Sequence, residues 1–331
     1  MPQLPIPKVT LKQLHYFVVL SETRNFTRAA AQCFVTQSTL SASLKELEDA
    51  LSAALVERDR QSVQLTPLGL QTVALARQIL AQAADVADLA HAARAPMVGH
   101  LKVGAIPTIA PFVLPDLMAR VRASYPELKL VLAEEQTAVL IERLEAGQLD
   151  AALLALPIDT GKLRLQPLYT DELWLAGLPG DPAVVAAHAK LGVEASTRLI
   201  LLEEGHCLRE HTLGACPKRV REANATEIGV EASSLLTLIH MADAGLGLAL
   251  VPEMALQAGI LKELRLIAKP FATPAPRRTI ALVSRATSAR GAELKALAGL
   301  LIAGKEARTQ RVLSNNARRS YGKLVTQAGN A

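Results

Sequence analysis

The sequence contains few cysteines, few aromatic residues and no long uncharged hydrophobic run. Three cysteines in 331 residues cannot form the disulfide framework of a small secreted protein. No apolar stretch reaches the roughly 20 residues of a transmembrane helix, and no signal-peptide hydrophobic region is found. Half of the chain is hydrophobic but only 3% is aromatic, so we expect a core of Leu, Ala, Val and Ile. These absences predict a cytoplasmic protein in which any disulfide is transient.

Length and charge predict two or three domains and a basic end. The formal net charge is +5, and residues 305–331 alone carry six basic side chains against one acidic, which is also +5. The rest of the chain is therefore near neutral, so net charge is weak support for nucleic-acid binding. We expect residues 305–331 to form a flexible, solubilising tail.

Two of the three cysteines lie nine positions apart in the segment 203–216. Cys207 directly follows His206 and stands two residues before Arg209. A thiol reacts with peroxide as its thiolate, and nearby positive charge lowers its pKa, so His206 and Arg209 are expected to activate Cys207. The sulfenic acid formed there would be captured by a second thiol, and Cys216 is the only one close in sequence.

A disulfide between these cysteines requires their segment to change shape. In a helix, nine residues would separate the two Cα atoms by about 13 Å, whereas a disulfide needs roughly 4.4–6.8 Å. Two other interpretations stay open. The pair could be inert buried residues, or four side chains could bind zinc, although their spacing matches no standard zinc pattern: His206, Cys207, His211 and Cys216. We predict neither a metal nor a cofactor.

Residues 1–66 show the pattern of a helix-turn-helix with a wing. Helices are predicted over Leu11–Leu20, over Arg28–Cys33 with Thr27 as cap, and from Thr36 to about Leu51. In this arrangement the last helix enters the major groove of double-stranded DNA. Polar residues suited to base edges or helix capping stand at its start and on one face: Thr36, Gln37, Ser38, Thr39, Ser41 and Lys45. Two arginines in the predicted wing are expected to contact phosphates: Arg58 and Arg60.

The remaining chain is predicted to hold a linker helix and an α/β domain. Pro67 stands at a favourable helix start, and residues 67–95 carry an apolar stripe that predicts pairing with a partner helix. Packing of this helix on its own domain is the alternative. Strands and helices then alternate over residues 96–304, which indicates α/β units on a parallel sheet. We expect two lobes, lobe I over about 96–167 and 275–304 and lobe II over about 168–274.

Residues 11–69 resemble the winged helix-turn-helix of LysR-type transcriptional regulators. The resemblance covers most of the chain and is carried by Phe26-Thr-Arg-Ala-Ala-Ala, Thr36-Gln-Ser-Thr-Leu-Ser, Leu47-Glu and Leu65-Thr-Pro-Leu-Gly. Gly205-His-Cys-Leu-Arg with Cys216 is similar to the OxyR-like, peroxide-sensing branch. The resemblance implies a two-lobed, periplasmic-binding-protein-like α/β regulatory domain, a dimer or homotetramer, and operator DNA and RNA polymerase as partners. The helix-turn-helix and the absence of a Cys-x-x-Cys recycling motif argue against an enzyme, and without a long apolar run we expect no membrane partner.

The resemblance also extends the predicted site. Thr108 and Thr137 match threonines that orient peroxide beside the reactive thiol, and a hydroxyl can both donate to and accept from peroxide. Helix capping is the alternative role for each. We thus predict a regulator of the oxidative-stress response in which hydrogen peroxide oxidises Cys207 and Cys216 resolves the sulfenic acid as a disulfide. Two rivals stay open: a LysR-type regulator that senses a small organic ligand between its lobes, and a thiol peroxidase.

Overall fold

The computed structural model describes residues 8–58, 63–92, 97–218 and 231–328. The chain divides into two compact units. The N-terminal unit comprises residues 1–94 with two short segments, 143–148 and 287–289. The larger unit comprises 95–142, 149–286 and 290–331.

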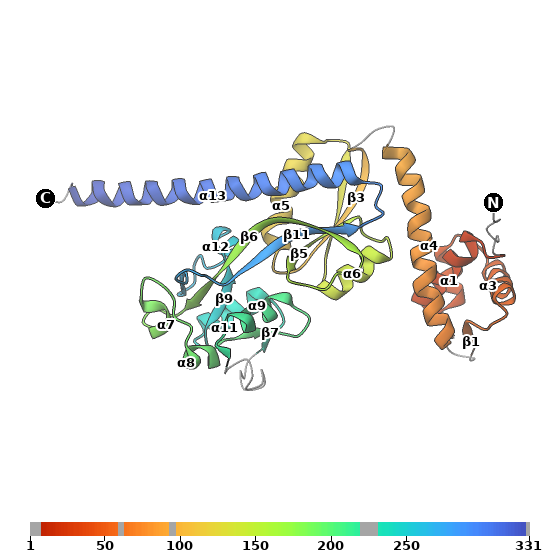
Figure 1. The fold of residues 1–331 in the computed structure, drawn as a ribbon, viewed down its shortest axis with the longest axis horizontal. Coiled ribbons are helices and arrows are strands. Elements are labelled where there is room, and N and C mark those ends of the chain that lie inside the picture. The colour runs from red at the N-terminus through yellow and green to blue at the C-terminus, as the bar shows by residue number, and fades with distance from the viewer. Residues whose placement is uncertain (1–7, 59–62, 93–96, 219–230, 329–331) are drawn as a thin grey trace. The chain divides into compact units, whose positions relative to one another are not determined.

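Four helices and a two-stranded wing make up the N-terminal unit (Figure 1). Its elements are α1 Leu11–Thr23, α2 Phe26–Gln32, α3 Gln37–Leu51, β1 Val56–Arg58, β2 Val63–Leu65 and α4 Pro67–Ala92. Thr10 and Gln13 form a capping box at α1. Thr36 caps α3, which is one of the two roles that the sequence suggested for it. The predicted Thr27 cap of α2 is wrong. Asn25 accepts the hydrogen bond from the Arg28 N–H, so α2 begins earlier.

The wing is fixed to α3 and α4 by local contacts. β1 and β2 pair antiparallel, and Glu48 on α3 accepts hydrogen bonds from the Leu55 and Val56 amides at 2.8 and 3.3 Å. Gly69 lies in the first turn of α4, where a Cβ atom would stand 2.1 Å from the Leu55 carbonyl oxygen. Only glycine allows this approach of α4 to the start of the wing.

The larger unit is a mixed α/β structure (Figure 1). Its elements are β3 Gly99–Ala105, α5 Ala110–Ser124, β4 Leu128–Glu134, α6 Thr137–Glu145, β5 Ala151–Leu156, β6 Leu163–Gly177, α7 Pro182–Val185, α8 Val193–Thr197, β7 Leu201–Leu202, α9 Cys207–Ala215, β8 Glu231–Ala232, α11 Leu235–Asp243, β9 Ala249–Pro252, α12 Glu253–Gln257, β10 Ile267–Lys269, β11 Arg277–Arg285 and α13 Gly291–Ala328. β3 pairs parallel with β4 and β5, whereas β11 pairs antiparallel with β5 and β6. The sequence predicted a parallel sheet, whereas the observed sheet is mixed. The difference arises because β11 returns to the first lobe in the opposite direction.

One long strand, β6, joins the two lobes. Residues 163–172 of β6 pair with β11 in the first lobe. Its last residues pair with β9 and β10 in the second lobe. The second lobe has its own hydrophobic core, built mainly of Leu, Ile, Val and Ala side chains. The expected order along the chain, a winged helix-turn-helix followed by a two-lobed α/β domain, is confirmed.

The C-terminal segment differs from the expected flexible tail. α13 begins at Gly291 and continues as helix to Ala328. Leu294, Leu297 and Leu301 are buried in its first turns. The segment lacks proline and is rich in Ala, Leu, Lys and Arg, which are strong helix formers.

Candidate functional site

Cys207 is the first residue of α9, and a glycine turn places it there. Gly205 has φ +93°, and a Cβ on it would lie 2.6 Å from the Gln136 side-chain oxygen. His206 follows as the N-cap residue of α9 and is buried. The backbone N–H groups of the first turn of α9 are therefore directed at the thiol of Cys207.

Opposing effects act on the ionisation of Cys207. Burial raises the pKa of the thiol, and this effect is the largest. The Arg278 guanidinium, the Thr137 hydroxyl and the amides of Cys207 and Leu208 each lower that pKa. The net pKa remains above the ordinary value, so the thiol is neutral in most molecules at pH 7, while every group that stabilises the thiolate is already in position.

Arg278 is the principal functional residue that the sequence analysis missed. It lies on β11 with 1% of its surface exposed and pairs with Asp171 at 3.0 Å. Two further guanidinium N–H groups donate to the Thr108 hydroxyl and carbonyl, at 2.8 and 3.0 Å. The sequence did carry a signal for this residue, because Arg278 directly precedes the apolar residues of a predicted strand. An arginine buried in such a strand requires charged or polar partners.

Thr108 and Thr137 both reach the surroundings of Cys207. Thr108 accepts from Arg278 and does not cap α5, whose N-cap residue Ile109 forms no side-chain cap. Thr137 is the first residue of α6, and its buried hydroxyl has no regular hydrogen bond within the described residues. With Gln136 and His206 they line a hollow at Cys207 that is too narrow for a water molecule.

Arg209 does not supply the charge predicted for it. Its guanidinium donates to the Leu202 carbonyl at 2.8 Å and to Glu231 at 2.6 Å. It is not among the groups that shift the pKa of Cys207. Of the two arginines, only Arg278, which is remote in sequence, lowers the pKa of that thiol.

Cys216 lies at the other end of α9. It is 4% exposed, belongs to the hydrophobic core of the second lobe, and its thiol donates to the Thr212 carbonyl at 3.4 Å. Both cysteines are free. The intact helix keeps them about 13 Å apart along its axis. Within the described residues, no three His, Cys, Asp or Glu side chains converge to hold a metal ion.

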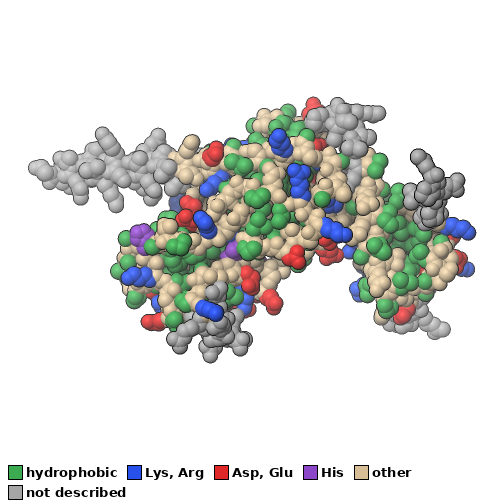
Figure 2. Space-filling model, in the orientation of Figure 1, with side chains coloured by type: hydrophobic (Ala, Val, Ile, Leu, Met, Phe, Trp, Pro, Cys, Tyr) green, Lys and Arg blue, Asp and Glu red, His purple; other side chains and the backbone are tan. Residues whose placement is uncertain are grey.

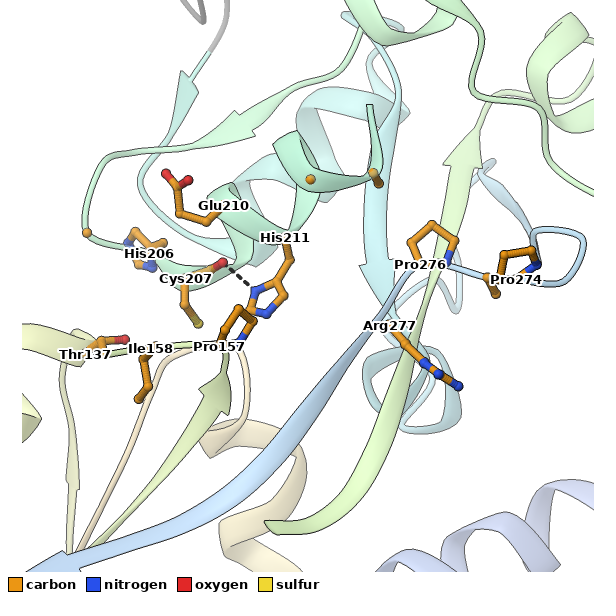
Figure 3. A pocket seen from close by; sticks show the side chains of 14 residues that line it. Thr137, Pro157, Ile158, His206, Cys207, Glu210, His211, Pro274, Pro276 and Arg277 are labelled. Atoms are coloured by element: carbon orange, nitrogen blue, oxygen red, sulfur yellow. Dashed lines mark hydrogen bonds between the residues drawn. The ribbon is translucent and has the colours of Figure 1, made fainter. Parts of the chain in front are cut away.

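A larger cavity of about 680 Å³ opens beside α9 (Figure 3). One wall is formed by residues of α9, including Cys207 and His211, and another by Pro157 and Ile158 after β5. Residues 274–277, which lead into β11, complete the lining. The volume is that of a small-molecule site, and most of the lining side chains away from α9 are apolar.

The residues predicted to contact DNA gather at the start of α3. The Thr36 hydroxyl accepts from the Thr39 amide, so this threonine does cap the helix. Gln37 accepts from the Thr27 hydroxyl at 3.0 Å, which orients its amide. Ser38 and Lys45 are exposed and Ser41 is half-buried. The backbone of Arg58 ends β1, and Arg60 lies outside the described residues.

α4 keeps part of its predicted apolar stripe on the surface. Val73 and Ala76 pack into the core of the N-terminal unit, whereas Leu75 and Val86 are 60% and 70% exposed. Figure 2 shows hydrophobic side chains on the visible surface of this unit. Among the helices of the described chain, none combines the length and apolar character needed to cross a membrane.

Two family models match the chain. Residues 11–70 match the bacterial regulatory helix-turn-helix protein of the lysR family, and residues 94–305 match the LysR substrate binding domain. The chain belongs to the LysR family of transcriptional regulators. Residues 11–70 are thus the DNA-binding helix-turn-helix of a LysR-family regulator. Members of this family are regulators and not enzymes, which removes the thiol peroxidase alternative.

LysR-family proteins of two different names are among those similar to this chain. The HTH-type transcriptional regulator EstR of Acinetobacter baylyi is 45% identical over 88% of this chain and 96% of its own length. A full-length OxyR variant from Pseudomonas aeruginosa has a TM-score of 0.73 and 34% identity, covering 88% of this chain and 94% of that one. A hydrogen-peroxide-bound OxyR variant from Corynebacterium glutamicum has a TM-score of 0.63 and 30% identity, covering 95% and 97%.

Proposed function

We propose that this LysR-family regulator senses hydrogen peroxide through Cys207. The observation that carries the proposal is the convergence of thiolate-stabilising groups on one thiol. The Arg278 charge, the Thr137 hydroxyl and the first amides of α9 all favour the ionised form of Cys207. An inert buried cysteine needs none of these groups, whereas a thiol that must attack peroxide needs them. The similarity to OxyR proteins supports the same function.

The reaction proceeds in two steps. The Cys207 thiolate attacks one peroxide oxygen, the O–O bond breaks, and water leaves after the second oxygen takes a proton. The resulting sulfenic acid is then attacked by the Cys216 thiol, which forms the S–S bond and releases a second water. Thr108 and Thr137 line the hollow at the thiol, which must widen to admit peroxide, and their hydroxyls are suited to orient the peroxide oxygens.

Disulfide formation would convert oxidation into a change of shape. Cys216 must leave the core of the second lobe, because the two cysteines stand at opposite ends of α9. α9 must therefore unwind, and the second-lobe core must repack. We infer that the change in shape of the second lobe is passed to the DNA-binding domains within a dimer or tetramer. The exposed apolar face of α4 would pair with the same helix of another chain in that assembly. Operator DNA at α3 and RNA polymerase are the expected partners.

Mass spectrometry of the peroxide-treated chain tests this proposal. A Cys207–Cys216 linkage is expected, and Cys207→Ser should abolish the transcriptional response to peroxide while operator binding persists. Cys33→Ser is the matched control, since Cys33 lies in the DNA-binding core and burial raises its pKa. A linkage through Cys33, or an unchanged response in Cys207→Ser, would refute the proposal.

A second function is favoured by the cavity beside α9. Its volume of about 680 Å³ far exceeds the size of hydrogen peroxide and suits a small organic effector. The 45% identity to EstR, a regulator whose name does not refer to peroxide, is in keeping with this alternative. If the chain senses such an effector, Cys207→Ser should keep full regulation, and thermal melting of the chain should rise with an organic ligand in both variants.

A further inference from the structure

His211 lies between two backbone carbonyl groups. Its Nδ1 stands 2.6 Å from the Cys207 oxygen, one turn back on α9. Its Nε2 stands 2.8 Å from the oxygen of Leu156, the last residue of β5. Figure 3 marks the first of these bonds. The imidazole therefore ties the first turn of α9, in the second lobe, to a strand end of the first lobe.

The two partners determine the charge state of this ring. A carbonyl oxygen can only accept a hydrogen bond, so both ring nitrogens must donate. A neutral imidazole has a single N–H, and its other nitrogen would direct a lone pair at a carbonyl oxygen within hydrogen-bond distance. An imidazolium has two N–H groups. Both bonds form together only when His211 is protonated.

Few other ionisable side chains lie near the His211 ring. Glu210 on α9, His206 before it and Arg277 on β11 line the same cavity. Figure 3 shows Glu210 and Arg277 pointing away from the His211 ring. The segments on its other sides, Pro157 with Ile158 and residues 274–276, carry no ionisable side chain. The other buried cation near Cys207, Arg278, is already paired with an aspartate.

We propose that His211 is a positioning residue that holds α9 as an imidazolium, and that formation of the Cys207–Cys216 disulfide releases its proton. This inference rests on the proposed function. Unwinding of α9 separates His211 from both carbonyl oxygens, so the two acceptors that require a proton on each ring nitrogen are lost and the imidazole can release one proton. Acidic pH thus stabilises the dithiol form, and rising pH favours the disulfide.

Equilibration with a glutathione redox buffer tests this linkage. Two thiols of the chain and one glutathione disulfide give one protein disulfide and two glutathione thiols, so the thiol protons cancel. The exchange constant should then be independent of pH unless a further group releases a proton. If His211 releases one proton, the exchange constant should rise by up to tenfold per pH unit within about pH 5–8. This corresponds to a fall in the reduction potential of the disulfide, relative to glutathione, of about 30 mV per pH unit.

Two variants separate the positioning role from a merely structural one. His211→Gln keeps one amide donor and cannot titrate, so its exchange constant should be flat with pH. His240→Gln changes an exposed histidine on α11 and should keep the slope of the unsubstituted chain. A flat constant in the unsubstituted chain, or equal slopes with and without His211, would overturn the inference although the disulfide forms.

A second measurement tests the charge of His211 without any variant, in case His211→Gln fails to fold. Nitrogen NMR of the dithiol chain at neutral pH should show both His211 ring nitrogens protonated, and a ring with one unprotonated nitrogen would overturn the imidazolium. This readout does not depend on peroxide sensing. Absence of any Cys207–Cys216 disulfide would instead overturn the proposed function, and the proton release with it.

Discussion

Replacing Thr137 with valine should raise the pKa of Cys207 with little loss of stability. The Thr137 hydroxyl is buried, has no regular hydrogen bond among the described residues, and lowers the pKa of the Cys207 thiol. A hydrogen bond to a charged group contributes about 1.5–3 kcal/mol. The hydroxyl can donate to the Cys207 sulfur once the thiolate forms. Because one pKa unit corresponds to 1.36 kcal/mol, removing that donor should raise the pKa of Cys207 by about one to two units. Valine keeps the shape of the side chain.

The rise in pKa should slow oxidation, but by less than the loss of thiolate alone. The pKa of Cys207 is already raised by burial, so its thiolate is the minor form at pH 7 and falls tenfold with each further unit. A thiolate of higher pKa is a stronger nucleophile, and with a Brønsted coefficient of about 0.4–0.5 this recovers nearly half of the loss on a logarithmic scale. Peroxide oxidation at pH 7 should slow by about four- to fifteenfold. In the unsubstituted chain the rate should rise with pH up to the raised pKa of Cys207.

Iodoacetamide alkylation of Cys207 as a function of pH, followed on its own peptide by mass spectrometry, measures the pKa directly. Stopped-flow oxidation gives the rate, and urea unfolding gives the stability. Thr137→Ser keeps the hydroxyl and should behave as the unsubstituted chain. The reasoning fails if Thr137→Val leaves the pKa of Cys207 unchanged, or if its main effect is a stability loss above about 2 kcal/mol, the size expected for a structural hydrogen bond.

Four other substitutions have distinct expected outcomes. Asp171→Ala should destabilise the chain by about 3–5 kcal/mol in urea unfolding, because Arg278 is left as an uncompensated buried charge; a loss below 1 kcal/mol would contradict this. Thr108→Val removes one acceptor of Arg278 and should cost about 1–3 kcal/mol and also slow oxidation; an unchanged oxidation rate would leave Thr108 outside the reaction. Gln37→Ala should weaken operator binding by about 1–3 kcal/mol, with relaxed preference at one base pair only. Arg58→Gln should weaken binding to all sequences alike and flatten the logarithmic salt dependence by about 0.9, and a base-specific effect would argue against a phosphate contact.

The sequence by itself determined the features that depend on neighbouring residues. Thr36 at the start of α3, Pro67 at the start of α4 and Gly205 before α9 each act on the backbone within about four positions. Caps, turns and hydrophobic periodicity have this short range. They were sufficient to predict the helix-turn-helix and the linker helix.

Only the tertiary structure decided which groups meet at that thiol. Arg278 lies 107 residues from Asp171 and 170 residues from Thr108, and the register of β11 against β5 and β6 brings them together. His211 and the Leu156 carbonyl are 55 residues apart. Arg209, close to Cys207 in sequence, is directed to other partners. Proximity along the chain does not fix the direction of a side chain, whereas strand pairing and lobe packing do, so the electrostatics of Cys207 could not be predicted from its sequence neighbours.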